Sequence, residues 1–436
     1  MTPERASGMH PERATGRRAV GRVLLAVGLA AVVLVGCGAP SSPPTPVPPS
    51  STLPAAAPPA GGRLLGGPPL DPVPAAAAGT ATWSPWPAAL HDARHSSASS
   101  GDGPTTGTVR WRRRLGGAAT GGPVVGRDGT VYTASNLGVL HALDPSTGAD
   151  RWTYASGRRG GSDLSTSALV MPNGTVVWGP PGRSELVGLS SAGSLLWTRP
   201  LPGRPTSPAS VDGHRLYVGD TGGHVTALDV DRGPRVAWTV AVGTTSYGSV
   251  VTDGSGRIYT TADSALIALD DRGATAGVAW RVEPRDDITE VSAGLAPDGT
   301  ALLGTNGSRE WAYRRDGSPR WNTARVITYS SPAVTADGLA YVADHSGRVR
   351  VLDIADGAEV AGYQLSSPEQ IWSSVAVDRA HRLYFATQDG HVLGAGPDGR
   401  VLFDVAVGDP VDSYPALTAD GVLIVGDRGG DVVAIG

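Results

Sequence analysis

Short apolar runs separated by glycine-containing turns recur along the chain from Thr108 to Gly436. The runs are rich in Val, Tyr, Leu and Ile, and DG, GS or GG pairs lie between them, as in antiparallel hairpins. No stretch of this region carries a helical period over ten or more residues, so we expect an all-β fold. One run occurs six times, as GTVYTAS (129–135), HRLYVGD (214–220), GRIYTTA (256–262), GLAYVAD (338–344), HRLYFAT (381–387) and GVLIVGD (421–427).

A tryptophan accompanies these runs at a nearly constant interval, and Ala361 and Phe403 continue its spacing. Eight units of about forty residues follow, each with four strands and the Trp position on the last one. Such units are the blades of a β-propeller. We therefore predict an eight-bladed β-propeller of four-stranded antiparallel blades over residues 108–436. The tryptophans, spaced by 41, 45, 41, 42 and 41 residues, are Trp111, Trp152, Trp197, Trp238, Trp280 and Trp321.

The two ends of this region each leave one strand without a blade. Thr108 to Arg114 is a Trp strand that no blade precedes, whereas the chain ends at Gly436 on a third strand that no Trp strand follows. Pairing these two strands would leave no free sheet edge. We predict that the N-terminal Trp strand closes the ring by completing the blade of residues 412–436.

Residues 142–152, ALDPSTGADRW, hold an acidic residue, a glycine and a tryptophan at fixed spacing. The carboxylate at the end of the third strand can accept bonds from the turn amides, and the glycine supplies a positive φ. The tryptophan then falls on the outermost strand, where its ring can fill the wedge between blades. We assign structural docking roles to Trp111, Asp144, Gly148, Trp152, Trp197, Asp229, Trp238, Trp280 and Trp321.

The pattern A-x-D-x-x-T-G-x-x-x-W at 142–152 resembles the tryptophan-docking motif of the PQQ-like repeat family. That family includes the pyrroloquinoline quinone (PQQ) dehydrogenase propellers and the outer-membrane assembly lipoprotein of the BamB type. Partial copies begin at Ala227 and Ala268, and the resemblance covers residues 83–436. It implies a propeller fold and, by analogy with the BamB type, a protein-binding scaffold.

Residues 1–36 have the features of a bacterial lipoprotein signal peptide. Basic residues up to Arg22 precede the apolar stretch 23–35, and the tetrapeptide Leu-Val-Gly-Cys at 34–37 resembles a lipobox. We predict lipidation at Cys37 and anchoring on the extracytoplasmic face of a bacterial cell membrane. The alternative is an ordinary secretory signal with a chance cysteine.

Residues 37–82 are rich in Pro, Ala and Ser and nearly uncharged, so we expect a disordered tether. Residues 83–107 are expected to pack on the propeller. Within them, His91, Asp92 and His95 are similar to a W-P-x-x-x-H-D-x-x-H stretch that often precedes the first blade in PQQ-like repeat proteins. Imidazole and carboxylate groups suit zinc, but packing of this segment against blade loops is the alternative that we adopt, with no metal site.

Composition excludes several kinds of chemistry. All 36 basic residues are arginine, so a Schiff-base, phosphate-loop or general-base lysine is ruled out. The single cysteine excludes an intrachain disulfide, and the folded region has no catalytic thiol. Without residues 1–36 the chain keeps 31 basic and 38 acidic residues, a net charge near −7 that argues against nucleic acid as a partner.

The loops at one face of the predicted ring surround a central funnel and hold most of the irregular sequence. Carboxylates and aromatics at such a mouth could bind a sugar, a peptide or Ca²⁺, although they could equally be solvated residues around a water-filled channel. The candidate ligand-binding residues are Asp163, Asp287, Glu290, Tyr329, Trp372, Asp412 and Tyr414.

Enzymatic signatures are missing from the sequence. By resemblance, a PQQ dehydrogenase would be much longer and carry a vicinal cysteine pair, and neither sialidase Asp boxes nor a G-x-S-x-G elbow occurs here. We expect no catalytic residues, no resident cofactor (neither PQQ nor Ca²⁺) and a monomer that binds a cell-envelope protein as a scaffold. The alternative is a sensor or enzyme that takes a small ligand or carbohydrate in the funnel.

Overall fold

The computed structural model describes residues 63–64, 83–157, 166–209, 213–231, 233–284, 288, 291–305, 308–326, 328, 330–365 and 370–436. All of them belong to the second of two units, Met1–Leu53 and Pro54–Gly436. The predicted signal peptide and Cys37 lie outside the described residues. Within the described ranges the chain forms strands and turns, and no helix there is long and apolar enough to cross a membrane.

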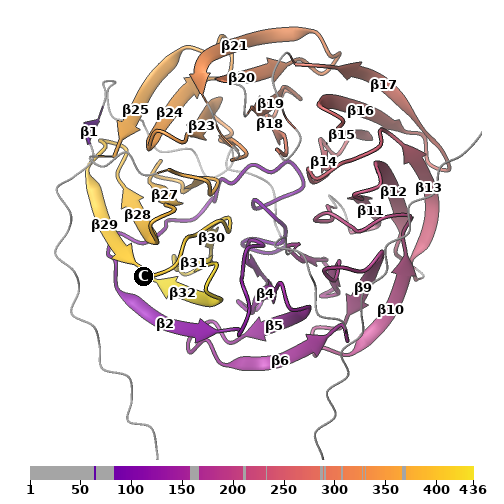
Figure 1. Cartoon of the computed structure of the whole chain (residues 1–436), viewed down its shortest axis with the longest axis horizontal. Coiled ribbons are helices and arrows are strands. Elements are labelled where there is room, and N and C mark those ends of the chain that lie inside the picture. Colours follow the sequence, from indigo (N-terminus) through magenta and orange to yellow (C-terminus); the bar gives the residue numbers. More distant parts are fainter. Residues whose placement is uncertain are drawn as a thin grey trace, which may run out of the picture. The chain divides into compact units, whose positions relative to one another are not determined.

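Eight antiparallel sheets surround a common centre, which confirms the predicted eight-bladed propeller (Figure 1). In blade 3 the described residues on the inner side of β11 pair through two isolated bridges, Pro205 with Asp220 and Ala209 with Tyr217. From the centre outward, blades 1 to 4 are β3 (Val124–Val125), β4 (Val131–Ser135), β5 (Val139–Leu143) and β6 (Asp150–Ala155); β7 (Leu169–Val170), β8 (Val176–Trp178), β9 (Glu185–Leu189) and β10 (Leu195–Pro200); β11 (Arg215–Gly219), β12 (His224–Asp229) and β13 (Arg235–Ala241); and β14 (Val251–Thr252), β15 (Arg257–Ala262), β16 (Ala265–Asp271) and β17 (Ala276–Val282). Blades 5 to 8 are β18 (Gly294–Leu295), β19 (Ala301–Gly304), β20 (Ser308–Tyr313) and β21 (Pro319–Val326); β22 (Ala333–Val334), β23 (Leu339–Ala343), β24 (Arg348–Asp353), β25 (Glu359–Gln364) and β1 (Arg63–Leu64); β26 (Ala376–Val377), β27 (Leu383–Ala386), β28 (His391–Ala395) and β29 (Val401–Ala406); and β30 (Ala416–Leu417), β31 (Leu423–Gly426), β32 (Asp431–Ile435) and β2 (Val109–Arg114).

The ring is closed by the chain's N-terminal Trp strand, as the sequence predicts. Strand β2 pairs antiparallel with β32, in a register that runs from Val109 opposite Ile435 to Arg114 opposite Asp431. The last strand of the chain is therefore covered on both sides, and β2 is the outer strand of blade 8 (Figure 1). This pairing covers the edge of β32, which would otherwise be open to association with other chains.

Apart from Trp197, the docking tryptophans donate to the turn of the following blade and not to the turn of their own motif. The Trp111 indole N–H donates to the Pro145 carbonyl at 2.7 Å, and a β-carbon on Gly148 would lie 2.5 Å from the Trp111 ring. Gly148 also has a φ of +69°, so both the backbone and the ring contact require glycine. Trp152 in turn donates to the Ser191 carbonyl of blade 2 at 2.8 Å.

Asp144 fixes the turn that receives Trp111. Its Oδ1 accepts the amide N–H groups of Ser146 at 3.0 Å and Thr147 at 3.2 Å. The hydrogen bonds from Ser146 hold the pKa of Asp144 well below its ordinary value, so the carboxylate stays ionised. The spacing of the motif therefore serves two contacts. Asp144 and Gly148 form the turn that receives Trp111 of the preceding blade, and Trp152 contacts the turn of the next blade.

The remaining docking residues follow this arrangement with local variation. Trp238 donates to the Asp271 carboxylate at 3.0 Å, and Asp229 pairs with Arg215 at 2.8 Å. Trp197 lies against Gly188 of its own blade, where a β-carbon would come within 2.1 Å of the ring. Trp280 and Trp321 donate to the carbonyls of the next blade's turn, at Arg315 (2.9 Å) and Ile354 (2.8 Å).

Blade 6 carries a fifth strand that the sequence did not predict. Arg63 pairs with Gln364 and Leu64 with Tyr363, which places β1 on the outer edge of β25. The two residues belong to the stretch expected to be a disordered tether. Because a strand edge can pair with any extended segment through backbone groups alone, side-chain pattern gives no signal for such pairing.

Residues 83–103 run across the middle of the ring and bond to its innermost strands (Figure 1). In six blades, the second residue of the innermost strand donates its amide N–H to a carbonyl of this segment. We call residues 83–103 the clasp. Its bonds are Val125 to Trp86 (2.7 Å), Val170 to Pro87 (2.7 Å), Thr252 to Ala93 (2.8 Å), Leu295 to Arg94 (2.9 Å), Val334 to Ser96 (2.7 Å) and Val377 to Ser97 (2.9 Å).

The clasp adopts a backbone that L-residues rarely use. Leu90, His91, His95 and Ser97 all have positive φ, between 47° and 84°. Such conformations persist only where surrounding contacts hold them. Here the six bonds between the clasp and the blades supply such contacts. The clasp lies at the end of the innermost strands, opposite the loops from which those strands begin.

Candidate functional site

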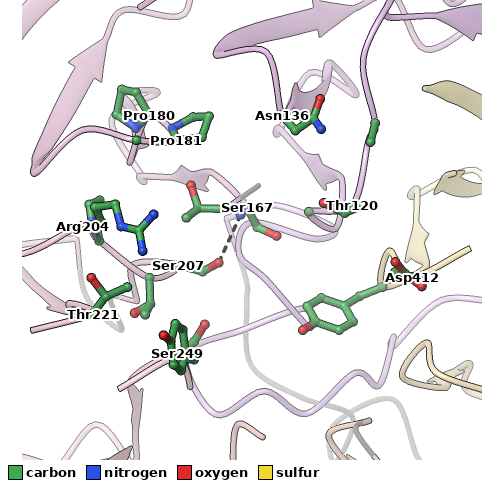
Figure 2. Close-up of a pocket in the computed structure, with 18 of the residues that line it drawn as sticks. Thr120, Asn136, Ser167, Pro180, Pro181, Arg204, Ser207, Thr221, Ser249 and Asp412 are labelled. Atoms are coloured by element: carbon green, nitrogen blue, oxygen red, sulfur yellow. Dashed lines mark hydrogen bonds between the residues drawn. The ribbon is translucent and has the colours of Figure 1, made fainter. Parts of the chain in front are cut away.

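A cavity of about 780 Å³ opens at the end of the ring opposite the clasp. We call this end the mouth. The cavity is lined by the segments that lead into the innermost strands and by the turns between second and third strands, as expected for a propeller funnel. Blades 1 to 4, 7 and 8 contribute to it, and Figure 2 shows lining side chains from several of them.

Three of the candidate residues from the sequence lie together in this cavity. Trp372 precedes β26 of blade 7, while Asp412 and Tyr414 precede β30 of blade 8. The other four, Asp163, Asp287, Glu290 and Tyr329, lie outside the described residues.

Two arginines that line the cavity were not predicted from the sequence. Arg428 stands in the turn between β31 and β32, and Arg204 precedes blade 3. Both occupy loop positions that the propeller prediction assigns to the mouth, so their position was a usable signal. They were missed because only carboxylates, aromatics, amides and imidazoles were considered there.

Trp372 is held at the centre of a polar and aromatic cluster. The Arg428 guanidinium carbon lies 5.6 Å from its ring centroid, a cation–π distance, and the His345 ring lies 5.8 Å away. Burial lowers the pKa of His345, so this ring is neutral at pH 7. Arg428 forms an ion pair with Asp412, whose Oδ1 also accepts the Gln388 amide at 2.8 Å.

The cavity wall formed by blades 2 to 4 is rich in hydroxyl groups. The Ser167 amide N–H donates to the Ser207 hydroxyl at 3.1 Å, a bond that links blade 2 to blade 3 (Figure 2). An equivalent bond, from the Ser249 amide N–H to the Ser292 hydroxyl at 2.8 Å, links blade 4 to blade 5. Arg204 is exposed, lies across the cavity from Asp412 and has no ion-pair partner among the residues described. The described lining thus offers aromatic faces, hydroxyls and the guanidinium of Arg204.

The donor set of the described cavity does not fit a quinone with its calcium ion. Calcium takes six to eight oxygen ligands, including carboxylates, whereas Asp412 is the carboxylate that lines the described cavity and it is paired with Arg428. In the described part of the chain no three His, Cys, Asp or Glu residues come together as a metal site. The described lining residues by themselves therefore offer such a group no adequate set of ligands.

The His-Asp-His stretch lies buried in the clasp, away from the mouth. The His91 Nδ1 and the Ser96 hydroxyl are 2.9 Å apart, and Asp92 accepts the amides of Arg94 and Ser96, each at 3.0 Å. Burial lowers the pKa of His95 to about 4, so its ring is neutral at pH 7. These contacts follow the packing alternative for this stretch.

Comparison with known proteins places the chain in a family. Residues 100–233 and 182–395 match the PQQ-like repeat model described as "Outer membrane protein assembly factor BamB", and these ranges span more than half of the chain. The chain belongs to this family.

Among curated relatives, Protein Rv3035 of Mycobacterium tuberculosis is 24% identical over 351 residues, which cover 78% of this chain and 70% of that protein. The outer membrane protein assembly factor BamB of Yersinia pestis is 31% identical over 181 residues, which cover 38% of this chain and 44% of the Yersinia protein. The first match spans most of the propeller, whereas the second spans less than half of either chain.

Solved structures share the propeller fold at low sequence identity. BamB from Moraxella catarrhalis superposes with a TM-score of 0.59 at 13% identity, over 76% of this chain and 99% of that one. Quinohemoprotein alcohol dehydrogenase from Comamonas testosteroni gives 0.63 at 15% identity, over 81% of each chain. At such identities the likeness concerns the fold alone.

Proposed function

We propose that this protein is a non-catalytic scaffold of the bacterial cell envelope that binds another envelope protein at its mouth. Membership of a family described as an outer membrane protein assembly factor supports the role class. The observation that carries the proposal is that Trp372, Arg428 and Tyr414 all line one open cavity, with Arg428 over the Trp372 ring.

These three residues have the composition of a protein-binding hot spot. Trp, Tyr and Arg are the residues most enriched where protein interfaces gain their binding energy. Trp372 is also held in advance of binding, because its indole N–H donates to Gln370 at 2.8 Å and Arg428 lies over its ring. Side chains that are already ordered lose less conformational entropy when a partner docks.

A photo-crosslinking amino acid at the mouth tests this proposal in cells. Tyr247, which lines the cavity and is 38% exposed, is the probe position, and Val278 on the outer strand of blade 4, 52% exposed, is the matched control. We expect one predominant adduct from position 247 that Trp372→Ala reduces at least tenfold, and no such adduct from 278. Equal crosslinking at both positions would contradict the proposal.

We further propose that Cys37 carries the lipid that anchors the protein on the extracytoplasmic face of the membrane. The lipobox-like tetrapeptide at 34–37 supports this. Metabolic labelling with a fatty-acid analogue should mark the full chain and not the Cys37→Ser variant, which should leave the membrane fraction. Label on the serine variant would rule out this attachment site.

A second candidate function is binding of a small ligand or carbohydrate in the cavity. The volume of about 780 Å³ favours it, because ligand pockets typically measure about 300–1,000 Å³. Thermal denaturation with calcium, with PQQ plus calcium and with a sugar panel tests it, since a ligand that binds only the folded state raises Tm. A flat response to every compound would leave the scaffold as the better account.

A further inference from the structure

Glu310 is a fully buried carboxyl group on β20 of blade 5. Its side chain has no exposed surface, and neither Oε1 nor Oε2 has a hydrogen-bond partner within the described parts of the chain. Burying a carboxyl group without partners is costly, and natural cores seldom retain one. This residue takes no part in the mouth cavity or in the clasp.

The seven other blades show what this position ordinarily holds. In each blade, the first residue of the innermost strand pairs with a residue of the second strand, which in turn pairs with a residue of the third strand. In blade 5, Glu310 lies two positions before that third-strand residue. Every counterpart is aliphatic and at most 1% exposed. The counterparts in blades 1 to 4 and 6 to 8 are Leu140, Leu186, Val225, Leu266, Val349, Val392 and Val432.

The residue of blade 6 that faces Glu310 across the seam is polar as well. Between blades 6 and 7, Val349 shares an apolar cluster with Ile371, and between blades 7 and 8, Val392 shares one with Val411. Thr328 occupies the corresponding place between blades 5 and 6. A β-carbon on Gly304 would lie 2.6 Å from the Thr328 methyl carbon and 3.3 Å from Glu310 Oε2, so both side chains converge on this glycine.

No charged group of the described chain compensates the carboxyl group. It faces Gly304 from β19, Thr323 from β21, and Thr328 and Ser330 from the segment that leads into β22. Thr323 lies directly opposite Glu310 in the register, and its hydroxyl is also unpartnered. The adjacent Arg309 points to the opposite face of the strand, as alternate residues do, and donates to Asn322.

Burial is the sole cause that raises the pKa of Glu310, well above its ordinary value. Burial therefore favours the neutral acid, whereas its ionised form would be a buried charge with no counter-ion among the described neighbours. Ionisation would act on a connected part of the seam, because the Ser330 amide donates to Thr328 at 2.9 Å and the Ser330 hydroxyl donates to Ala343 of blade 6 at 3.2 Å.

We propose that the seam between blades 5 and 6 is a proton-controlled opening point of the ring, closed by neutral Glu310 and loosened by its carboxylate. Glu310 stands where the seven other blades hold an aliphatic residue, so this seam is the place where one deprotonation weakens blade packing. The segment containing Thr328 and Ser330 leads into β22, so loosening it acts on the innermost strand of blade 6. This inference is independent of the proposed binding role.

The pH dependence of unfolding tests the proposal. Because the folded state holds the proton more tightly than the unfolded state, the contribution of Glu310 is fully present below pH 4.5 and is lost as pH rises toward its folded pKa. Within that window the unfolding equilibrium constant of the full chain should rise about tenfold per pH unit relative to Glu310→Gln. Glu310→Leu, which restores the residue type of the other blades, should be more stable than the parent at every pH above 4.5.

Two further readouts separate this role from a merely structural one. Glu283→Gln removes an exposed carboxylate and should keep the parent's pH profile. Hydrogen exchange of the Ser330 amide should quicken with pH more steeply than that of its counterpart Ser373, and Glu310→Gln should abolish the difference. Parallel profiles for the parent and Glu310→Gln would overturn the proposal. Stabilisation by CaCl₂ that depends on Glu310 would overturn it too, by showing a cation site.

Discussion

The tryptophan–glycine contact is the smallest unit on which the ring depends. Gly148 has φ +69° and lies under the Trp111 ring, whereas Gly273 in blade 4 has φ +85° and nothing within 4 Å of its β-carbon position. The two positions share the backbone requirement and differ in the ring contact. They therefore allow the docking contribution to be measured separately.

Gly148→Ala should destabilise the protein more than Gly273→Ala. Both substitutions place a β-carbon at positive φ, at a cost of roughly 1–2 kcal/mol. Gly148→Ala also displaces the Trp111 ring, and overpacking of this kind costs about 1–3 kcal/mol more. Urea unfolding followed by tryptophan fluorescence measures both. Equal losses would mean that the Trp111 contact contributes nothing.

His95 should make the protein less stable in acid. Burial lowers its folded-state pKa to about 4, so the unfolded state binds a proton more readily. Its contribution is fully present above its unfolded pKa of 6.5 and is lost as pH falls toward 4, by roughly 3 kcal/mol in all. His95→Gln should reduce this acid loss in urea titrations, whereas substitution of the exposed His214 should not. If His95→Gln loses as much stability in acid as the parent, His95 is not the cause of that loss.

At the scale of elements, the clasp makes the closed end of the ring. Six amides of the innermost strands use clasp carbonyls as acceptors, and each such bond contributes about 1 kcal/mol. A chain that begins at residue 104 should show faster hydrogen exchange at those amides and a lower urea midpoint. A chain that begins at Trp83 keeps the clasp and should match the full chain at the same sites. If both truncations behave alike, the clasp is not what holds that end together.

Elements that follow from side-chain pattern were predictable, and those that follow from backbone pairing were not. The forty-residue recurrence of tryptophan and β-branched runs predicts eight blades, and the strand count predicts the pairing of β2 with β32. The clasp bonds and β1 use main-chain groups, which every residue carries equally. No side-chain pattern distinguishes them.

The same distinction applies to the candidate site. Trp372, Asp412 and Tyr414 were identified because carboxylates and aromatics in irregular loops stand out against the repeat. Glu310 was missed because a charged residue within a strand is expected on the solvent face. Only the register, which aligns it with Leu140 and its counterparts, shows that it is buried.

At the scale of the whole propeller, the two ends of the described ring differ. The clasp bonds across one end, and the cavity of about 780 Å³ opens at the other. A partner or ligand of the described cavity therefore approaches from the mouth, where Trp372 and Arg428 lie. The clasp, the seams and the mouth all keep their positions only if the eight blades form a closed circle.

Native-state hydrogen exchange of β32 tests that closure most directly. The closed ring makes β32 an interior strand between β31 and β2, with the Gly436 amide bonded to the Thr108 carbonyl at 2.9 Å. Its amides that face β2 should exchange as slowly, within about tenfold, as those of β28 that face β29 in blade 7, because both require global unfolding. Exchange of the β32 amides at the rate of an open sheet edge would contradict the closed ring and the account built on it.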